Sequence, residues 1–382
     1  MPKPMNPAVR DIALSGIRKF FNLVQDKEDI LSLTIGQPDF TVPDTVKHAV
    51  KEAVDLNKTT YTQNQGLYEL REKTSAYINE RYHANWTADH VLVTVGASQA
   101  IDIALRTLLV PGDEVILPSP IYPGYEPLVK LQGAHVVEID TTESKFKLTP
   151  TQLEKAITDK TKVLILPYPS NPTGVTLTKE ELADIKDVAK KYDLYIITDE
   201  IYSAISFDTP HVSMATFEDI KDQLIVINGL SKSHAMTGLR IGFLFGPKWL
   251  IPEFTKVLQY NVSCATSTSQ YAALNAVTEA KDAPIQMCAE YLKRRDYVYH
   301  RLTKMGLDVV KPGGAFYFMF KLKDSRPSFE VALDLVNRAN LALVPGSSFG
   351  QYGEGFLRLS FAYSMATLKE GLDRLESYLQ HN

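Results

Sequence analysis

The sequence predicts an α/β protein with a mainly parallel sheet, joined to a smaller α+β domain. Three observations predict this architecture. From about residue 90 onward, short runs rich in β-branched residues alternate with amphipathic helical windows. Beyond residue 267 the alternation stops, and a long helical stretch continues to residue 304 without a strand. At 382 residues the chain is also longer than one hydrophobic core usually serves.

Seven apolar runs are the expected strands of the large sheet. They are Val91–Val95, Glu114–Leu117, His135–Ile139, Lys162–Leu166, Leu194–Thr198, Leu224–Ile227 and Ile241–Phe245. Two of the helices between them have clear start signals: Thr149 precedes a proline, and Thr178 opens a capping box that ends at Glu181. Strand–helix alternation of this kind places helices on both faces of the sheet. We therefore expect a large domain over residues 46–285.

The rest of the chain predicts the smaller domain. After the long helical stretch come the expected strands Ala315–Phe320, Leu341–Val344 and Leu357–Ala362, with a helix around Phe329–Ala339. A last helix follows with four leucines on one face, namely Leu368, Leu372, Leu375 and Leu379. The first 45 residues lack the strand–helix rhythm, so we expect residues 1–45 to pack with residues 286–382.

The composition excludes several classes of protein. A net charge of −4 without a long basic run argues against a nucleic-acid partner. The sequence contains no run of about 18 apolar residues, so we expect no membrane-spanning helix. The amino terminus is polar and proline-rich, with no apolar segment typical of a secretory signal. Cys264 and Cys288 lie far apart without metal-ligand spacing, which argues against disulfides and zinc. We expect a cytoplasmic protein without a metal site.

The chemically richest segment follows the apolar strand that ends at Ile227. It contains Lys232 within Asn228–Gly242. A lysine just after a buried strand is unusual, because burial disfavours its charge, lowers its pKa and frees the amine to attack carbonyl groups. Taken alone, a lysine such as Lys232 is more often a surface residue in a serine-rich turn.

Three other strand ends carry polar groups. Asp199 ends an apolar strand and needs a cation or a donor there, such as a protonated pyridine nitrogen, although a helix-capping aspartate is the alternative. Asn171 lies in an Asn-Pro-Thr-Gly turn that is either a plain turn or a source of an amide in the same cleft. The stretch Val91–Ala100 runs from strand through small residues to helix, an arrangement suited to phosphate. It lacks the glycine fingerprint of dinucleotide sites.

These four segments, in this order, resemble the class I/II aminotransferases of pyridoxal-phosphate-dependent fold type I. The family carries a phosphate turn, an Asn-Pro-Thr-Gly turn, an Asp-Glu-x-Tyr strand end and a Ser-Lys cofactor segment with a later arginine. The chain is also similar to the family at Gly36–Phe40, Tyr61–Arg71 and Leu357–Ser360. The resemblance extends from about residue 30 to residue 360.

The resemblance implies a role for each matching residue. Lys232 resembles the lysine that carries pyridoxal 5′-phosphate, and Asp199 the partner of its ring nitrogen. Asn171 and Tyr202 are similar to the donors toward its phenolate oxygen, and Arg358 and Gly36 to groups that contact the substrate. The remaining cofactor contacts implied are Ala97, Ser98, Tyr122, Ser231, Arg240, and Tyr61 from a second subunit of a homodimer. Gly229 stands where many relatives have serine, which puts one phosphate donor in doubt.

The resemblance further implies an aminotransferase that moves an amino group between an L-amino acid and a 2-oxo acid, with glutamate and 2-oxoglutarate as one pair. The amino-terminal segment Ser15–Phe21 favours a bacterial branch with aspartate, aromatic and N-acetyl-diaminopimelate aminotransferases, and we favour the last, in lysine biosynthesis. A C–S lyase or aminocyclopropane-carboxylate synthase shares nearly all these residues. A regulator that uses this fold to bind an effector is the alternative of another class. Arg18 and Lys19 are candidates for contact with a distal carboxylate, or residues of a solvated helix.

Overall fold

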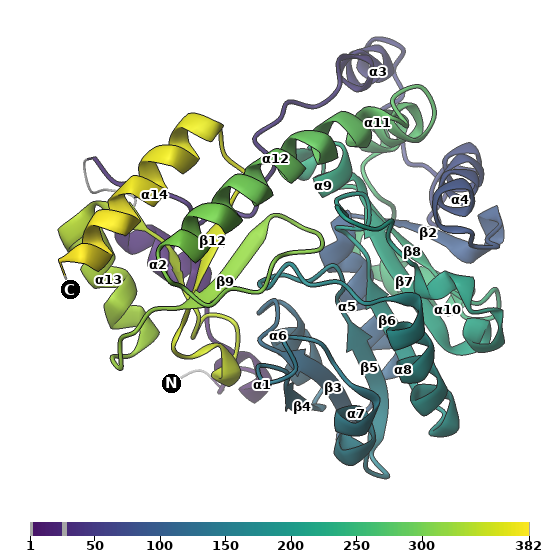
Figure 1. Cartoon of the computed structure of the whole chain (residues 1–382). Helices are drawn as coiled ribbons and strands as arrows, with labels where there is room; N and C mark the ends of the chain where they lie inside the picture. Colours follow the sequence, from purple (N-terminus) through teal and green to yellow (C-terminus); the bar gives the residue numbers. More distant parts are fainter. Residues whose placement is uncertain (1–2, 25–28, 382) are drawn as a thin grey trace.

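A computed structural model describes residues 3–24 and 29–381 of the chain. Two parts lie side by side in it (Figure 1). One contains a large sheet with helices on both faces, and the other is built around strands β9 and β12. In the described residues no helix is both long and apolar enough to cross a membrane.

The large sheet has seven strands in the order β2-β8-β7-β6-β5-β3-β4. Strand β8 is antiparallel to its two neighbours, and all other neighbouring pairs are parallel. The strands are β2 (Val91–Thr94), β3 (Glu114–Ser119), β4 (His135–Asp140), β5 (Thr161–Leu166), β6 (Tyr195–Asp199), β7 (Leu224–Gly229) and β8 (Gly242–Phe245). The mainly parallel seven-stranded sheet is thereby confirmed, and each predicted strand agrees to within two residues.

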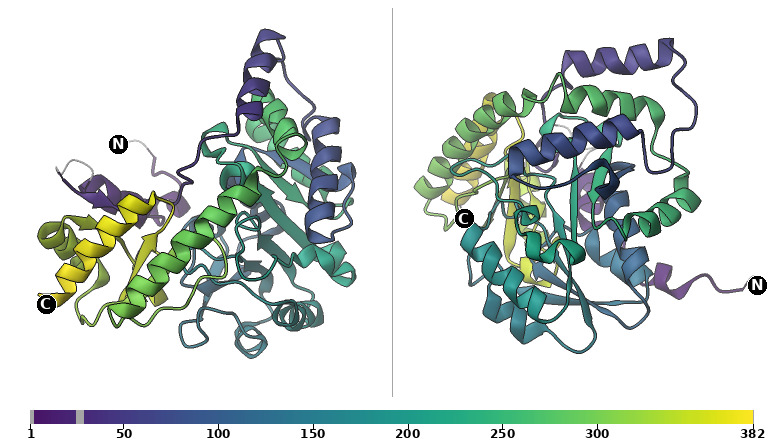
Figure 2. Two further views of the ribbon diagram at one scale, coloured as in Figure 1. Left: turned by 45° about the horizontal axis from the view of Figure 1, so that its top comes forward. Right: turned by 90° about the vertical axis from the view of Figure 1, so that its right-hand side faces the viewer.

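Both faces of this sheet are buried, which explains the continuous apolar runs. In β5, Val163 and Ile165 belong to one apolar cluster and Leu164 and Leu166 to another. The first cluster includes residues of α5 (Gly96–Leu108), α6 (Tyr125–Leu131) and α10 (Ile251–Val262). The second includes residues of α3 (Asp44–Asp55), α4 (Tyr68–Tyr82), α7 (Pro150–Ala156), α8 (Lys179–Lys191) and α11 (Ser267–Val277). Figure 2 shows α3 at the top of the molecule, beside α11.

The smaller part has an antiparallel sheet of order β11-β12-β9 and a separate parallel pair of β1 with β10. Its strands are β1 (Leu31–Ser32), β9 (Tyr317–Lys321), β10 (Leu341–Ala342), β11 (Val344–Pro345) and β12 (Phe356–Ser360). Its helices are α2 (Gly16–Val24), α12 (Ala283–Lys304), α13 (Ser328–Ala339) and α14 (Met365–Gln380). Phe20, Val24 and Leu33 share one apolar cluster with residues of these elements. That segment therefore packs with the tail as expected, whereas α1 (Pro7–Arg10) contacts α6.

Two details differ from the prediction. The expected strand Leu341–Val344 is wrong as one element, because β10 pairs with β1 while β11 pairs with β12 in another sheet. The long helical stretch is divided between α11 and α12, with a break after Val277. The exact domain boundary at residue 285 stays a prediction.

Candidate active site

A cavity of about 420 Å³ lies where the carboxyl ends of β5, β6 and β7 face the smaller part. Ligands of open α/β sheets bind at this edge, because the turns after the strands meet there. Eleven of the predicted site residues line the cavity: Gly36, Ala97, Ser98, Tyr122, Asn171, Asp199, Tyr202, Ser231, Lys232, Arg240 and Arg358. Tyr61 and the candidates Arg18 and Lys19 are outside its lining. Segments as far apart as residues 36 and 358 therefore meet at one site.

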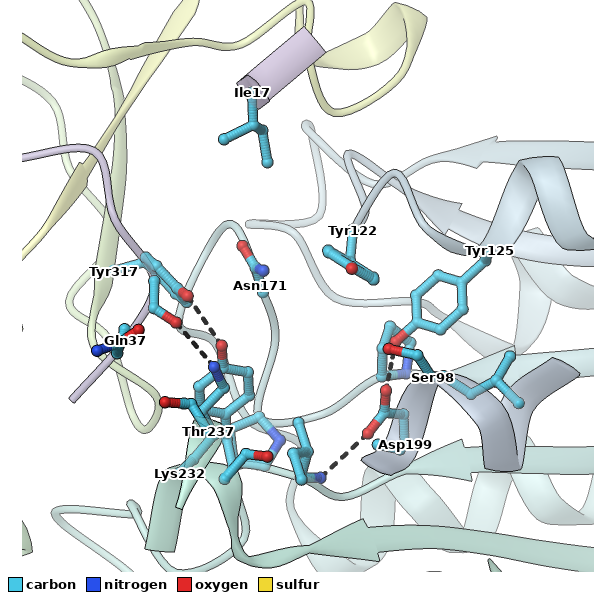
Figure 3. A pocket seen from close by; sticks show the side chains of 18 of the residues that line it. Ile17, Gln37, Ser98, Tyr122, Tyr125, Asn171, Asp199, Lys232, Thr237 and Tyr317 are labelled. Carbon is cyan, nitrogen blue, oxygen red and sulfur yellow. Dashed lines mark hydrogen bonds between the residues drawn. The ribbon is translucent and has the colours of Figure 1, made fainter. Parts of the chain in front are cut away.

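Lys232 lies on the single-turn helix α9 (Leu230–Ser233), directly after β7. Its Nζ donates a 2.7 Å hydrogen bond to the carbonyl oxygen of Gly36 (Figure 3). Burial lowers the pKa of Lys232 to about 8, and the charges of Arg240 and Arg358 act in the same direction. A substantial fraction of this amine is therefore neutral slightly above neutral pH, as a nucleophile or a general base requires.

Asp199 ends β6 with its carboxyl group inside the cavity wall. One carboxyl oxygen accepts a 2.8 Å hydrogen bond from the Tyr125 hydroxyl and the other a 3.1 Å bond from the Ile201 amide. Burial nevertheless raises the pKa of Asp199 to about 6. A buried carboxyl group of this kind gains most from a cationic partner inside the cavity.

Tyr125 is a site residue that the sequence reasoning missed. It begins α6, three residues after Tyr122, and the two rings meet edge to face with centroids 5.5 Å apart. Tyr122 lies in the turn before this helix, so no helical spacing in the sequence indicated that Tyr125 joins the site. In Figure 3 both rings border the cavity, and only Tyr125 reaches Asp199.

Arg358 lies in β12 and is almost completely buried, with 2% of its surface exposed. It donates hydrogen bonds to the Thr34 carbonyl oxygen at 2.6 Å and to Asn171 Oδ1 at 2.8 Å. Its Nε has no hydrogen-bond partner among the described residues. No carboxylate pairs with this guanidinium in the described ranges, so a ligand carboxylate would satisfy a buried cation there.

The start of helix α5 forms an anion cradle with Arg240. Gly96 has a φ of +75°, and a Cβ on it would lie 2.6 Å from Arg240 Nη2. A Cβ on Gly242 would lie 2.6 Å from the backbone nitrogen of Ala97. These two glycines therefore allow the guanidinium, the helix start and β8 to approach closely. Free N–H groups at a helix start together with a guanidinium suit a phosphate.

Gly229, where a serine donor was expected, lies in a tight space. A Cβ there would lie 3.1 Å from Ile201 and 3.2 Å from the Gly242 Cα. Thr237 lines the cavity beside Arg240 and brings a hydroxyl group that the sequence reasoning did not consider. Thr237 therefore adds a hydroxyl-bearing residue to the cavity lining.

The residues fit pyridoxal 5′-phosphate in charge as well as in placement. Three cationic side chains and one carboxyl group line the cavity, namely Lys232, Arg240, Arg358 and Asp199. The phosphate, the ring nitrogen and the aldehyde of the cofactor each find a group of suitable chemistry in this lining, and so does the carboxylate of a substrate. Tyr61, by contrast, is 86% exposed and lies outside the lining of this cavity.

Comparisons with known proteins agree with this geometry. The family model described as aminotransferase class I and II matches residues 28–375. A probable N-acetyl-LL-diaminopimelate aminotransferase of Bacillus subtilis (strain 168) is 56% identical over 377 residues, which are 98% of this chain and 95% of that protein.

Solved structures are similar over nearly the whole chain. The aromatic aminotransferase of Pyrococcus horikoshii OT3 is 38% identical, with a TM-score of 0.90 over 96% of this chain and 99% of that one. The aspartate aminotransferase of Thermus thermophilus with maleate is 32% identical, with a TM-score of 0.93 over 98% and 100% of the two chains. This similarity confirms the predicted fold type I.

Proposed function

This chain belongs to the class I and II aminotransferase family and is an aminotransferase, and we propose that it works with pyridoxal 5′-phosphate held at Lys232. The observation that carries the proposal is a buried lysine with a pKa of about 8 in one cavity with the buried carboxyl group of Asp199. When bound, the cofactor supplies an electron sink for the carbanion formed at the substrate Cα. The residue roles that follow are part of the proposal.

Asp199 would face the ring nitrogen and keep its proton in place. Ionised Asp199 stabilises a cation beside it, and the protonated nitrogen in turn lowers the pKa of the carboxyl group. The Tyr125 hydroxyl fixes the orientation of this carboxyl group through the 2.8 Å hydrogen bond. Asp199 therefore controls the electronic state of the cofactor rather than its attachment.

Lys232 would move the proton of the reaction. Its amine takes the proton from the substrate Cα and later returns a proton, so it must be neutral at the start of the step. Burial and two nearby guanidinium groups favour that neutral state. The hydrogen bond to the carbonyl oxygen of Gly36, a proposed substrate contact, supports this role.

Arg358 and Asn171 would hold the substrate carboxylate. The guanidinium is fixed from two sides, by the Thr34 carbonyl oxygen and by Asn171 Oδ1. A planar guanidinium binds a carboxylate with two parallel hydrogen bonds. This orientation sets the direction of the Cα–H bond, and orientation contributes on the order of 7–11 kcal/mol at best.

As the amino donor we propose N-acetyl-LL-diaminopimelate, with glutamate and 2-oxoglutarate as the partner pair and lysine biosynthesis as the pathway. The support is the similarity to the probable N-acetyl-LL-diaminopimelate aminotransferase. Aromatic and aspartate aminotransferases are more distant relatives, and their substrates are the alternatives. A screen of amino donors with 2-oxoglutarate tests this, and a preference for tyrosine or aspartate would contradict it. Product release without any oxo acid would instead indicate a lyase.

We also propose a cytoplasmic location. The chain has only two cysteines, and both are free in the described structure. Free thiols are usual in a reducing compartment.

The active unit we propose is a homodimer whose sites are shared through Tyr61. This side chain is 86% exposed and does not line the cavity of its own chain, so the tyrosine is available to a second copy. Symmetric dimers are the most common oligomers, and a twofold axis makes both sites equivalent.

Subunit exchange between Tyr61→Phe and Lys232→Ala tests the shared site. In the mixed dimer one site would carry both changes and the other neither, so activity at limiting cofactor should rise above that of the Tyr61→Phe parent. Tyr260→Phe changes another tyrosine that is 86% exposed and serves as the control, with cofactor binding like the wild type. Activity at only the average of the two parents would place Tyr61 within its own site.

A further inference from the structure

Tyr317 connects two groups of the cavity that the proposed function treats separately. It begins β9, is 1% exposed and lies opposite Ser360 of β12. Its hydroxyl oxygen is 2.8 Å from that of Tyr202, and its ring centre is 4.4 Å from the guanidinium carbon of Arg358. Figure 3 shows Tyr317 at the cavity wall with its hydroxyl directed toward Tyr202. One side chain therefore contacts both the carboxylate-binding arginine and the hydroxyl next to the cofactor.

Two glycines show how tightly Tyr317 is enclosed. A Cβ on Gly36 would lie 2.1 Å from the Tyr317 hydroxyl oxygen, so no other residue fits at Gly36 unless this tyrosine moves. Gly174, with a φ of +71°, lies against the backbone, where a Cβ would be 2.7 Å from the Tyr317 carbonyl oxygen. Tyr317 is thus enclosed on two sides. On one side lies Gly36, whose carbonyl oxygen accepts the hydrogen bond of Lys232, and on the other lies Gly174, in the same turn as Asn171.

The direction of the hydrogen bond between the two tyrosines follows from their chemistry. A phenol has a single proton, so Tyr202 donates either to Tyr317 or into the cavity. Burial raises the pKa of both phenols. The Arg358 guanidinium carbon, however, lies 4.4 Å from the ring centre of Tyr317. A cation this close to a phenol favours release of its proton, so Tyr317 is the better donor. Its donation leaves the proton of Tyr202 free for the cavity.

We propose that Tyr317 is a positioning residue of the transamination reaction, which donates to the Tyr202 oxygen and so strengthens Tyr202 as a donor toward the phenolate oxygen of the cofactor. The inference rests on the proposed function. Hydrogen bonds in a chain polarise one another, so a donor behind Tyr202 makes its own proton more acidic. The ring of Tyr317 has a separate task, the support of the Arg358 guanidinium.

Tyr317→Phe separates the two tasks, because it removes the hydroxyl and keeps the ring. In the cofactor-loaded enzyme we expect kcat to fall roughly three- to tenfold, the size of one net hydrogen bond, while KM for the amino donor changes less than about twofold. A weaker donor at Tyr202 stabilises the deprotonated form of the bound cofactor less. The pKa read from the visible absorbance of the cofactor should therefore rise by about half a unit to one unit.

Three further variants make the test specific. In a Tyr202→Phe background, Tyr317→Phe should cause no additional shift of the titration, because its effect passes through Tyr202. Tyr317→Leu should also raise KM, because the ring under Arg358 is lost. Tyr77→Phe is the control: it removes a buried hydroxyl that has no partner in the described part of the chain and lies outside the cavity, and it should titrate like the wild type.

The outcomes separate this inference from the proposed function. A wild-type protein without transaminase activity or without a visible absorbance band would refute the function itself. An active wild type with an unchanged titration and kcat in Tyr317→Phe would refute only the role of Tyr317. Should Tyr317→Phe not fold, 3-fluorotyrosine at position 317, a more acidic phenol, should move the titration to lower pH. An unchanged or upward-shifted titration would then overturn the inference.

Discussion

The two walls of the cavity are built in different ways. One wall, named the cofactor wall after its proposed role, comes from segments at one edge of the large sheet, and its members are Ser98, Asp199, Lys232 and Arg240. The substrate wall comes from the smaller part, and its members are Gly36, Tyr317 and Arg358. Backbone pairing within the large sheet, both parallel and antiparallel, fixes the first wall. The pairing of β9 with β12 holds Tyr317 and Arg358 in the second wall. Contacts between distant segments complete it, such as the hydrogen bond from Arg358 to the Thr34 carbonyl oxygen across 324 residues of sequence.

This difference indicates a division of work. Groups that lie on a continuous sheet keep their distances to one another, so the cofactor wall can hold one geometry for every substrate. The substrate wall belongs to another sheet and another apolar cluster, so its side chains can differ without disturbing the cofactor. Changes in the cofactor wall should therefore lower kcat, and changes in the substrate wall should raise KM. The Tyr317 hydroxyl is the exception, because it acts through Tyr202 on the cofactor side.

The largest expected effect belongs to Lys232→Ala. Loss of the amine removes both the attachment point and the proton carrier, so kcat should fall on the order of 10⁴-fold while the fold is retained. Single-turnover kinetics and circular dichroism measure the two quantities. Lys248→Ala, a lysine outside the cavity lining, is the control. Transamination by Lys232→Ala at an appreciable fraction of the wild-type rate would refute the role of this residue.

Asp199→Asn should have the next largest effect. The amide keeps the size of the side chain and loses its charge, so the ring nitrogen loses the group that holds its proton. We expect the half-reaction with saturating cofactor to slow on the order of 10²–10³-fold, with little change in KM. Equal single-turnover rates in variant and wild type would show that Asp199 does not face the ring nitrogen.

Arg358→Ala tests the substrate wall. It removes the charge-assisted hydrogen bonds to the carboxylate, so KM should rise roughly 10- to 150-fold for amino acid and oxo acid alike. Cofactor affinity, measured by equilibrium dialysis, should change much less. A variant that loses cofactor as readily as it loses substrate would contradict the division between the walls.

The smallest effect concerns stability without cofactor. The folded-state pKa of Asp199, about 6, lies above its ordinary value of 3.8. The free-energy cost of burying the ionised Asp199 carboxylate in the folded protein is therefore absent below about pH 4 and complete above about pH 6. Asp199→Asn should raise the free energy of unfolding of the cofactor-free protein at pH 7 by at most about 3 kcal/mol, and by nothing near pH 4. Denaturant unfolding at the two pH values measures it, and an equal gain at both would contradict the assigned pKa.

The sequence predicted residues of both walls, including Gly36 and Arg358, but it missed Tyr125 and Tyr317. The cofactor wall follows strand ends, where a polar residue after an apolar run is visible, so Asp199 and Lys232 could be identified. Tyr125 was missed because its contact with Asp199 joins the start of α6 to the end of β6, 74 residues away in the sequence. Tyr317 gave no signal, because an aromatic residue inside Ala315–Phe320 looks like any core residue until β9 pairs with β12. A local sequence pattern does not show which distant strands and helices lie next to one another.

The most direct test of the central claim is borohydride reduction followed by peptide mass mapping. Protein purified with pyridoxal 5′-phosphate should be yellow, and reduction should abolish the visible absorbance and leave a pyridoxyl group on the peptide that contains Lys232. The same treatment of Lys232→Ala should label no peptide of this cavity. A label on another lysine of the wild type, or a protein that stays colourless with saturating cofactor, would contradict the assignment of Lys232.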